Sequence, residues 1–143
     1  MSSSVTVNVL ALSICTHKAY QSMKERNVDD GHIVNINGMC GHRVITNPDL
    51  HFYTATKYAV TTLTEGLRQA LRVENSHIRA TGISPGLVET EFLSRFYKNN
   101  PYKSTWCILC IQVTDVANAV TYVLSAPLHV QIGDVRMQGT EQV

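Results

Sequence analysis

The run His32-Ile33-Val34-Asn35-Ile36 is short, largely apolar and rich in β-branched side chains. A polar turn, Asn27 to Gly31, precedes this run, and Gly38 follows it. A run of this length between turn residues predicts a buried strand. The same pattern predicts a second strand over Ile78 to Ser84 and a last, short strand over Asp134 to Gln138.

Helical patterns separate these strands. Apolar residues spaced by three and four positions predict a helix from about Thr6 to Lys24, with its first half buried on most sides. The same spacing predicts a long helix from about Phe52 to Glu74, and a third from about Asp115 to Ser125 with Thr114 as its N-cap. Residues 89–112 read as an irregular segment that includes a short helix. Strands that alternate with helices indicate parallel crossover connections and therefore an α/β fold.

The composition predicts a single globular domain over residues 1–143. Hydrophobic residues make up 44% of the chain, which is enough to form a core, and the formal net charge is +1. A net charge this close to zero argues against a nucleic-acid or membrane-surface partner, because such partners need a field of one sign. No apolar run approaches the roughly 18 residues of a membrane-spanning helix, and the first residues lack the positive region of a signal peptide. We therefore expect a cytoplasmic protein.

The cysteines follow no metal-binding or redox pattern. The chain has 4 Cys, and Cys107 and Cys110 form a single Cys-x-x-Cys pair. A zinc site needs a second pair, or a histidine pair, at a defined spacing. A redox pair opens a helix after a strand. Neither context is evident, so we expect reduced cytosolic thiols and no metal site.

One pair of residues is a candidate for catalysis. It consists of Tyr53 and Lys57, in the order Tyr53-Thr54-Ala55-Thr56-Lys57. Four residues apart on a helix, the two side chains lie on one face about one turn apart. A nearby ammonium group favours the phenolate and lowers the pKa of a tyrosine from its usual value of about 10. Such a tyrosine acts as a general acid or base on an alcohol or ketone oxygen. The alternative, commoner for an isolated pair, is a half-buried tyrosine beside a surface lysine.

Two further segments surround this pair. The first predicted strand ends in Asn35-Ile36-Asn37-Gly38-Met39-Cys40-Gly41, and the second ends in Ile83-Ser84-Pro85-Gly86-Leu87-Val88-Glu89-Thr90. In this order they resemble the motifs of the short-chain dehydrogenase/reductase family, where N-I-S-S-x-x-G precedes Y-x-x-x-K and P-G-x-V-x-T follows it. The resemblance covers nearly the whole chain from Val5 onward. It implies the C-terminal part of a doubly wound, Rossmann-type parallel sheet, with about three strands and flanking helices.

The resemblance also implies catalytic roles. Tyr53 would protonate the substrate carbonyl oxygen as hydride arrives. Lys57 would lower the pKa of Tyr53 and hydrogen-bond the nicotinamide ribose. Asn8, on the first helix, would hold a water molecule in the proton relay behind Lys57.

By the same resemblance, the cofactor would be NADP(H) and the substrate a small carbonyl compound such as a ketosteroid. The turn after the second strand would contact the nicotinamide amide and the phosphates. The cofactor-binding residues would be Tyr53, Lys57, Pro85, Gly86, Val88 and Thr90.

The family's catalytic serine has no counterpart at the matching position. Gly38 aligns with that serine, and a glycine has no side-chain donor. The loss of one preorganised donor costs about 10²–10³ in turnover. Cys40 lies 13 residues before Tyr53, a spacing that some family members use for the serine. We interpret the loop as two residues longer, so that Cys40 is not the substitute, and Asn37 would supply a donor only if the end of the strand shifted.

The first half of the family's fold is also absent from the 143 residues. No G-x-x-x-G-x-G turn, which holds a cofactor pyrophosphate at a helix N-terminus, occurs in the sequence. Two functions are therefore weighed. One is NADP(H)-dependent reduction of a carbonyl or ketosteroid, impaired or absent in this chain. The other is a non-catalytic, truncated or pseudogene-like fragment that acts through dimerisation with relatives.

The missing half has consequences for association and substrate choice. The strand over residues 32–36 would have an open apolar edge, which invites pairing with another chain. The helices over residues 6–24 and 52–74 would lie on one side of the sheet. In the family they also form the dimer face, so we expect a homo- or hetero-oligomer through them. The segment from Glu91 to Gln112 would replace the family's substrate loop, and there Phe96 and Trp106 indicate an apolar ligand.

Overall fold

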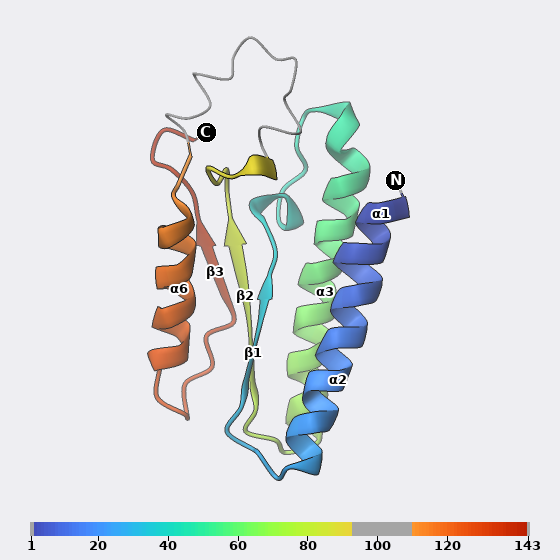
Figure 1. Cartoon of the computed structure of the whole chain (residues 1–143), viewed down its shortest axis with the longest axis vertical. Coiled ribbons are helices and arrows are strands. Elements are labelled where there is room, and N and C mark those ends of the chain that lie inside the picture. Colours follow the sequence, from blue (N-terminus) through green and yellow to red (C-terminus); the bar gives the residue numbers. More distant parts are fainter. Residues whose placement is uncertain (1, 93–109, 143) are drawn as a thin grey trace.

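The structure, a computed structural model, describes residues 2–92 and 110–142. The described residues form three layers (Figure 1). Helices α2 (Leu12–Glu25) and α3 (His51–Val73) cover one face of a central sheet, and α6 (Val113–Ser125) covers the other. This arrangement confirms the predicted α/β fold with helices flanking the sheet.

The sheet has three parallel strands in the order β1-β2-β3. They are β1 (His32–Ile36), β2 (Arg79–Pro85) and β3 (Asp134–Met137), each within one residue of its predicted bounds. Strand β2 is buried along its whole length because both neighbours and both helical layers cover it. Among the described residues β1 pairs with β2 alone, so its outer edge is open, as the sequence predicted.

The first predicted helix forms as one rod, built from α1 (Ser2–Val5), the π-helical turn η1 (Thr6–Ala11) and α2. The expectation that its first half is buried on most sides is wrong. Val7 is 63% exposed and Leu10 is 54% exposed. The reason is that the first half of this rod packs against α3, whereas contact with the sheet begins only further along, where α2 meets β1.

Helices α2 and α3 end in the same way. Asn27 and Asn75 adopt φ values of 56° and 54°, the left-handed conformation that terminates a helix. After α2 the N–H of Val28 donates to the carbonyl of Met23 (2.9 Å), the long hydrogen bond of a Schellman turn. Asparagine takes the position where glycine is usual because its short polar side chain tolerates this backbone.

The cap of α6 differs from the prediction of Thr114. The helix begins at Val113 and is capped by Gln112, which forms a capping box with Asp115. The Asp115 carboxylate accepts the backbone N–H of Gln112 at 2.8 Å. The helix starts earlier than expected because this reciprocal pair satisfies N–H groups that would otherwise lack a partner.

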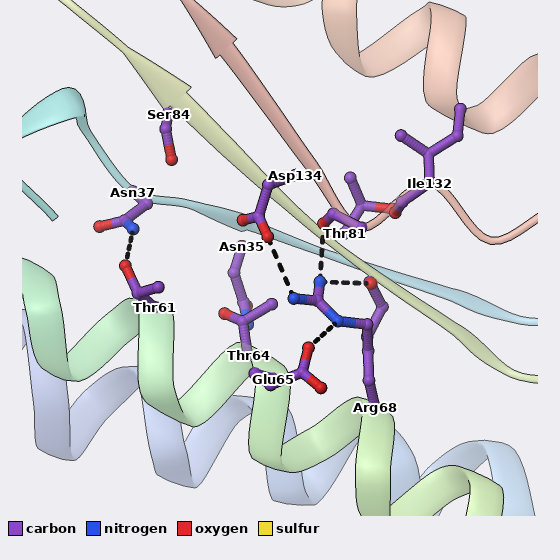
Figure 2. Close-up of polar contacts among 12 residues, drawn as sticks. Asn35, Asn37, Thr61, Thr64, Glu65, Arg68, Thr81, Ser84, Ile132 and Asp134 are labelled. Carbon is purple, nitrogen blue, oxygen red and sulfur yellow. Dashed lines mark hydrogen bonds and ion pairs between the residues drawn. The ribbon is translucent and has the colours of Figure 1, made fainter. Parts of the chain in front are cut away.

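Helix α3 packs on the sheet through a row of polar contacts, which we call the polar seam (Figure 2). Its members are Asn35, Asn37, Thr61, Thr64, Arg68 and Asp134. Asn35 donates to Thr64 Oγ1 (3.0 Å), and Arg68 donates to Asp134 Oδ2 (3.1 Å). The apolar part of this interface is a small cluster of Leu71, Ile78 and Ala80 at the C-terminal end of α3.

Candidate functional site

Tyr53 and Lys57 lie near the start of α3, beside the carboxyl end of β1. Lys57 is 8% exposed, and its ammonium group donates to the carbonyl oxygens of Ile36 (3.4 Å) and Asn37 (3.1 Å). The same ammonium nitrogen lies 5.9 Å from the centre of the Tyr53 ring. The structure therefore brings the predicted pair together at the edge of the sheet where open α/β folds bind their ligands.

The expectation that Lys57 lowers the pKa of Tyr53 is wrong for this structure. Burial raises the pKa of Tyr53 to about 12, and the negative charge that nearby Cys40 carries when ionised adds to the rise. Lys57 does not counter this shift because its ammonium group is directed at the two strand-end carbonyls rather than at the phenol oxygen. Burial also lowers the pKa of Lys57. Tyr53 thus keeps its proton at neutral pH and is equipped to donate it.

Asn8 is connected to the pair through Thr56. Its side-chain amide donates to Thr56 Oγ1 at 3.0 Å, and Thr56 Oγ1 donates to the carbonyl of Tyr53 at 2.7 Å. Asn8 belongs to the π-helical turn η1, and such turns are frequent at functional sites. The structure thus places Asn8 against the residue before Lys57. Its role in holding a water molecule stays a prediction.

The turn that follows β2 lies next to this pair. Pro85 is buried, and the N–H of Gly86 donates to the carbonyl of Met137 at 2.7 Å. Phe92, beyond the turn, stacks on Tyr53 with ring centres 5.9 Å apart. That contact brings the turn and Tyr53 to one place.

The two predicted contact residues of the turn differ in exposure. Val88 is half-buried and forms an isolated parallel bridge with Ile111, which ties the ends of the following segment together. Thr90 is exposed, and its hydroxyl donates to the carbonyl of Val88 at 3.4 Å. Both residues therefore lie at the same edge of the sheet as Tyr53.

The loop between β1 and α3 explains one motif glycine. A side chain at Gly41 would place its Cβ 2.7 Å from the carbonyl oxygen of Lys57, closer than real Cβ atoms come. The hydroxyl of Thr61 donates to the carbonyl of Gly41 at 2.8 Å, which holds the loop against α3. Glycine is needed here so that the loop backbone can approach the helix that carries Lys57.

Asn37 is not available as a donor to a ligand. Its side-chain amide nitrogen donates to Thr61 Oγ1 at 2.8 Å, and the side chain faces α3 (Figure 2). Its amide oxygen is among the buried polar atoms that have no hydrogen-bond partner. An oxygen cannot donate, so the structure does not support Asn37 as the replacement for the missing serine.

Several contacts of the site were missed at the sequence level. His42 Nε2 and Ser84 Oγ lie 2.8 Å apart and join the loop to β2, and burial lowers the pKa of His42. Gln142 Oε1 accepts the N–H of Leu87 at 3.0 Å and so fixes the turn after β2. No spacing rule links residues so far apart in the chain.

Other candidate features contribute nothing to the site as described. Cys107, Phe96 and Trp106 lie outside the described residues, so the Cys-x-x-Cys pair and the aromatic prediction are not placed. No group of His, Cys, Asp or Glu within residues 2–92 and 110–142 is arranged to hold a metal ion. None of the described helices is both long enough and apolar enough to span a lipid bilayer.

Comparison with known proteins assigns the family. The family model described as "short chain dehydrogenase" matches residues 1–101. The chain belongs to this family of short-chain dehydrogenases. Its human relative named "Dehydrogenase/reductase SDR family member 11" is 63% identical over 140 residues, which are 96% of this chain and 54% of the relative. "Farnesol dehydrogenase" of Aedes aegypti is 42% identical over 131 residues, which are 92% of this chain and 51% of the relative.

Solved structures of short-chain dehydrogenases share the fold. The structure titled "The Closed form of serine dehydrogenase complexed with NADP+" superposes with a TM-score of 0.81 at 31% identity, covering 97% of this chain and 55% of that one. The chain thus spans about half the length of the curated relatives and of the solved structure that it matches. The activity, substrates and partners of a whole short-chain dehydrogenase accordingly enter below as proposals.

Proposed function

We propose that this chain carries the catalytic part of an NADP(H)-dependent carbonyl reductase. The observation that supports the proposal is the half-buried phenol of Tyr53, which keeps its proton, beside an ammonium group fixed at the carboxyl end of β1. Reduction of a ketone adds a hydride to carbon and a proton to oxygen. Tyr53 would supply that proton, and Lys57 would hold the positive charge next to the developing alkoxide.

The residues at the carboxyl edge suit the nicotinamide end of such a cofactor, which supplies the hydride when bound. An ammonium group has three donors, and two of those of Lys57 reach the carbonyls of Ile36 and Asn37. The third has no acceptor among the described residues and would donate to a ribose hydroxyl. Val88 and Thr90 would face the nicotinamide amide and the phosphates, on a turn shaped by Pro85 and Gly86. The sequence offers no glycine-rich turn for the pyrophosphate, so the proposed contacts concern the nicotinamide end of the cofactor.

An apolar carbonyl compound, such as a ketosteroid, is the proposed substrate class. Phe92 covers the ring of Tyr53 and gives the site an apolar wall. The name of the farnesol dehydrogenase relative points to an apolar alcohol or aldehyde in that protein. A cytoplasmic location is part of the same proposal.

The test is NADPH oxidation, followed by the loss of absorbance at the nicotinamide band, with a diketone and with a ketosteroid. Turnover by the chain, abolished in Tyr53→Phe, is the expected result, because phenylalanine keeps the ring and removes the proton donor. Tyr58→Phe is the matched control, since Tyr58 lies on the same helix and is 39% exposed. Equal rates in Tyr53→Phe and in the control would overturn the proposal.

A second candidate function is association without catalysis. Large apolar side chains stay exposed on the first helical rod and on α3, including Ile14 at 61% and Leu63 at 37%. Patches of this kind mark interaction surfaces. We propose that helices 6–24 and 52–74 bind a second copy or a relative of the chain.

Sedimentation of the chain alone, and mixed with the human relative, tests this association. A dimer or heterodimer is expected, and Leu10→Glu should weaken it because Leu10 is 54% exposed on that surface. Arg72→Glu, which also lies on an exposed part of α3, controls for added negative charge. A strictly monomeric chain in both samples would contradict the proposal.

A further inference from the structure

Gly38 leaves room for a side-chain carbon near the ends of β1 and β2. Among the described residues, a Cβ placed on Gly38 would meet Cys40 Sγ at 3.5 Å and the carbonyl oxygen of Pro85 at 3.8 Å. Both are ordinary van der Waals distances, and the φ of Gly38 is 179°, which any residue adopts. The position therefore tolerates a side chain, and the absence of one leaves the Cys40 sulfur as the nearest atom to the space.

The Cys40 sulfur is held in place by the short helix η2 (Met39–Gly41). The N–H of Gly41 donates to the carbonyl of Gly38 at 2.9 Å, and Thr61 fixes the carbonyl of Gly41 from α3. The Cys40 side chain is 8% exposed. It is thus a buried thiol on a backbone that is anchored to the helix carrying Tyr53 and Lys57.

The Cys40 thiol lies close enough to Tyr53 and Lys57 for electrostatic interaction with both side chains. A negative charge on Cys40 raises the pKa of both Tyr53 and Lys57, while Lys57 lowers the pKa of Cys40. Burial is the larger effect on Cys40, and it raises the pKa of the thiol. Cys40 therefore stays protonated at neutral pH, and an S–H group is a weak hydrogen-bond donor.

The neighbouring polar side chains already have hydrogen-bond partners within the protein. The side-chain amide nitrogen of Asn37 donates to Thr61, and the hydroxyl of Ser84 is paired with His42. Of the two described atoms within 4 Å of a Cβ at Gly38, Cys40 Sγ and the carbonyl oxygen of Pro85, only the thiol can donate a hydrogen bond. The sequence analysis set Cys40 aside because the loop reads as two residues longer, yet its sulfur lies beside position 38 in the structure.

We infer that the Cys40 thiol acts as the second hydrogen-bond donor to the substrate carbonyl oxygen, beside the hydroxyl of Tyr53, in place of a side chain at position 38. The inference rests on the proposed carbonyl reduction. The thiol would orient the carbonyl and share the negative charge that develops on its oxygen, and it would neither form nor break a covalent bond. No second proton is consumed, because Tyr53 supplies the one that the alcohol gains.

A cycle of four proteins tests the role: the unchanged chain, Cys40→Ala, Gly38→Ser and the double variant. In the unchanged background Cys40→Ala should lower kcat/KM for a diketone by about 10²-fold, the loss expected for one preorganised donor. In the Gly38→Ser background the same change should cost less than about threefold, because the new hydroxyl takes over. A purely structural role for Cys40 predicts equal losses in both backgrounds, and that result would overturn the inference.

A second readout separates this inference from the proposed function. The variant Cys15→Ser/Cys107→Ser/Cys110→Ser retains one thiol, whose S–H stretching band is recorded by infrared spectroscopy with and without cyclohexanone. The band should shift to lower frequency as the thiol donates to the ketone, and adding Cys40→Ser should remove it. If turnover is absent but the band shifts, the proposed function fails and the donor role stands. An unchanged band at saturating cyclohexanone rejects the donor role.

Discussion

The two faces of β2 are covered by helices that pack on the strand in different ways. On the α3 face the contacts are the hydrogen bonds of the polar seam, such as Asn35 to Thr64 (Figure 2). On the α6 face Ile83 of the strand and Val123 of the helix are both fully buried, and a polar contact, from the Arg79 guanidinium to the carbonyl of Ala126 (3.0 Å), lies at the C-terminal cap of the helix. Alternate residues of a strand point to opposite faces, so one strand serves both.

The difference shows how each helix is used. Apolar burial is not directional, so the contact of Ile83 with α6 defines the position of that helix less closely than hydrogen bonds would. Hydrogen bonds require defined distances and angles. The polar seam therefore fixes the rotation of α3 about its own axis and its position along the strands. Helix α3 carries Tyr53 and Lys57, whose chemistry depends on their position relative to the strand ends. The polar face is therefore the one that positions the site.

Replacement of Arg68 should have the largest effect on stability. Its guanidinium is buried and donates to Glu65 and Asp134 and to the carbonyls of Ala80 and Gly133. Arg68→Ala should lower the free energy of unfolding by about 4 kcal/mol, because the partners stay behind unpaired. Urea denaturation measures the change.

The control for that experiment is Arg72→Ala on the exposed side of the same helix, with an expected change within about 0.5 kcal/mol. Arg68→Met keeps most of the volume without the hydrogen bonds. Full stability in Arg68→Met would break the comparison, since both faces would then depend on burial alone.

On the apolar face, Ile83→Ala should cost about 3 kcal/mol, from lost transfer energy and the cavity that remains. Ile83 is fully buried, whereas Ile36 on the edge strand is 48% exposed. Ile36→Ala is the matched control and should cost far less. Thermal unfolding of both variants provides the measurement, and similar losses would mean that burial does not govern this face.

A subtler change in the polar seam is Thr64→Val, which keeps the shape and removes the acceptor of the Asn35 amide. The expected cost is about 1–2 kcal/mol, because a buried donor is left without a partner. The ring signals of Tyr53 in NMR spectra should also shift, as α3 moves. Thr62→Val on the exposed face is the control. Unchanged Tyr53 signals in Thr64→Val would indicate that the seam does not position the site.

The smallest expected effect lies at the opposite end of the sheet, on the surface. A hydrogen bond from His77, with further donors in His77 and Ser76, lowers the pKa of Asp29 from 3.8 to about 2. A carboxyl group with a depressed pKa stabilises the fold above its unfolded pKa, and that contribution is lost as the pH falls through about 4 to 2. The melting temperatures of the chain and of Asp29→Asn should therefore converge over this range. A constant difference down to pH 2 would contradict the prediction.

Local sequence patterns predicted some of the secondary structure of the chain. The β-branched run over residues 32–36 gave β1 with its observed bounds, and the alternation of strands and helices gave the parallel order. The same patterns failed for the first helix, because apolar spacing predicts a buried face but does not say which element covers it. Val7 and Leu10 are apolar at helical spacing and yet exposed.

In the candidate site, too, local sequence determined some features and the tertiary structure determined others. The spacing of Tyr53 and Lys57 determined that both lie on one helical face, since this depends only on helix geometry. Their ionisation depended on the tertiary structure, because burial and the strand-end carbonyls set the pKa of each group. The position of Cys40 beside the space at Gly38 was decided there too. Distances along the chain fix local geometry, whereas desolvation and contacts between distant segments exist only once the chain has folded.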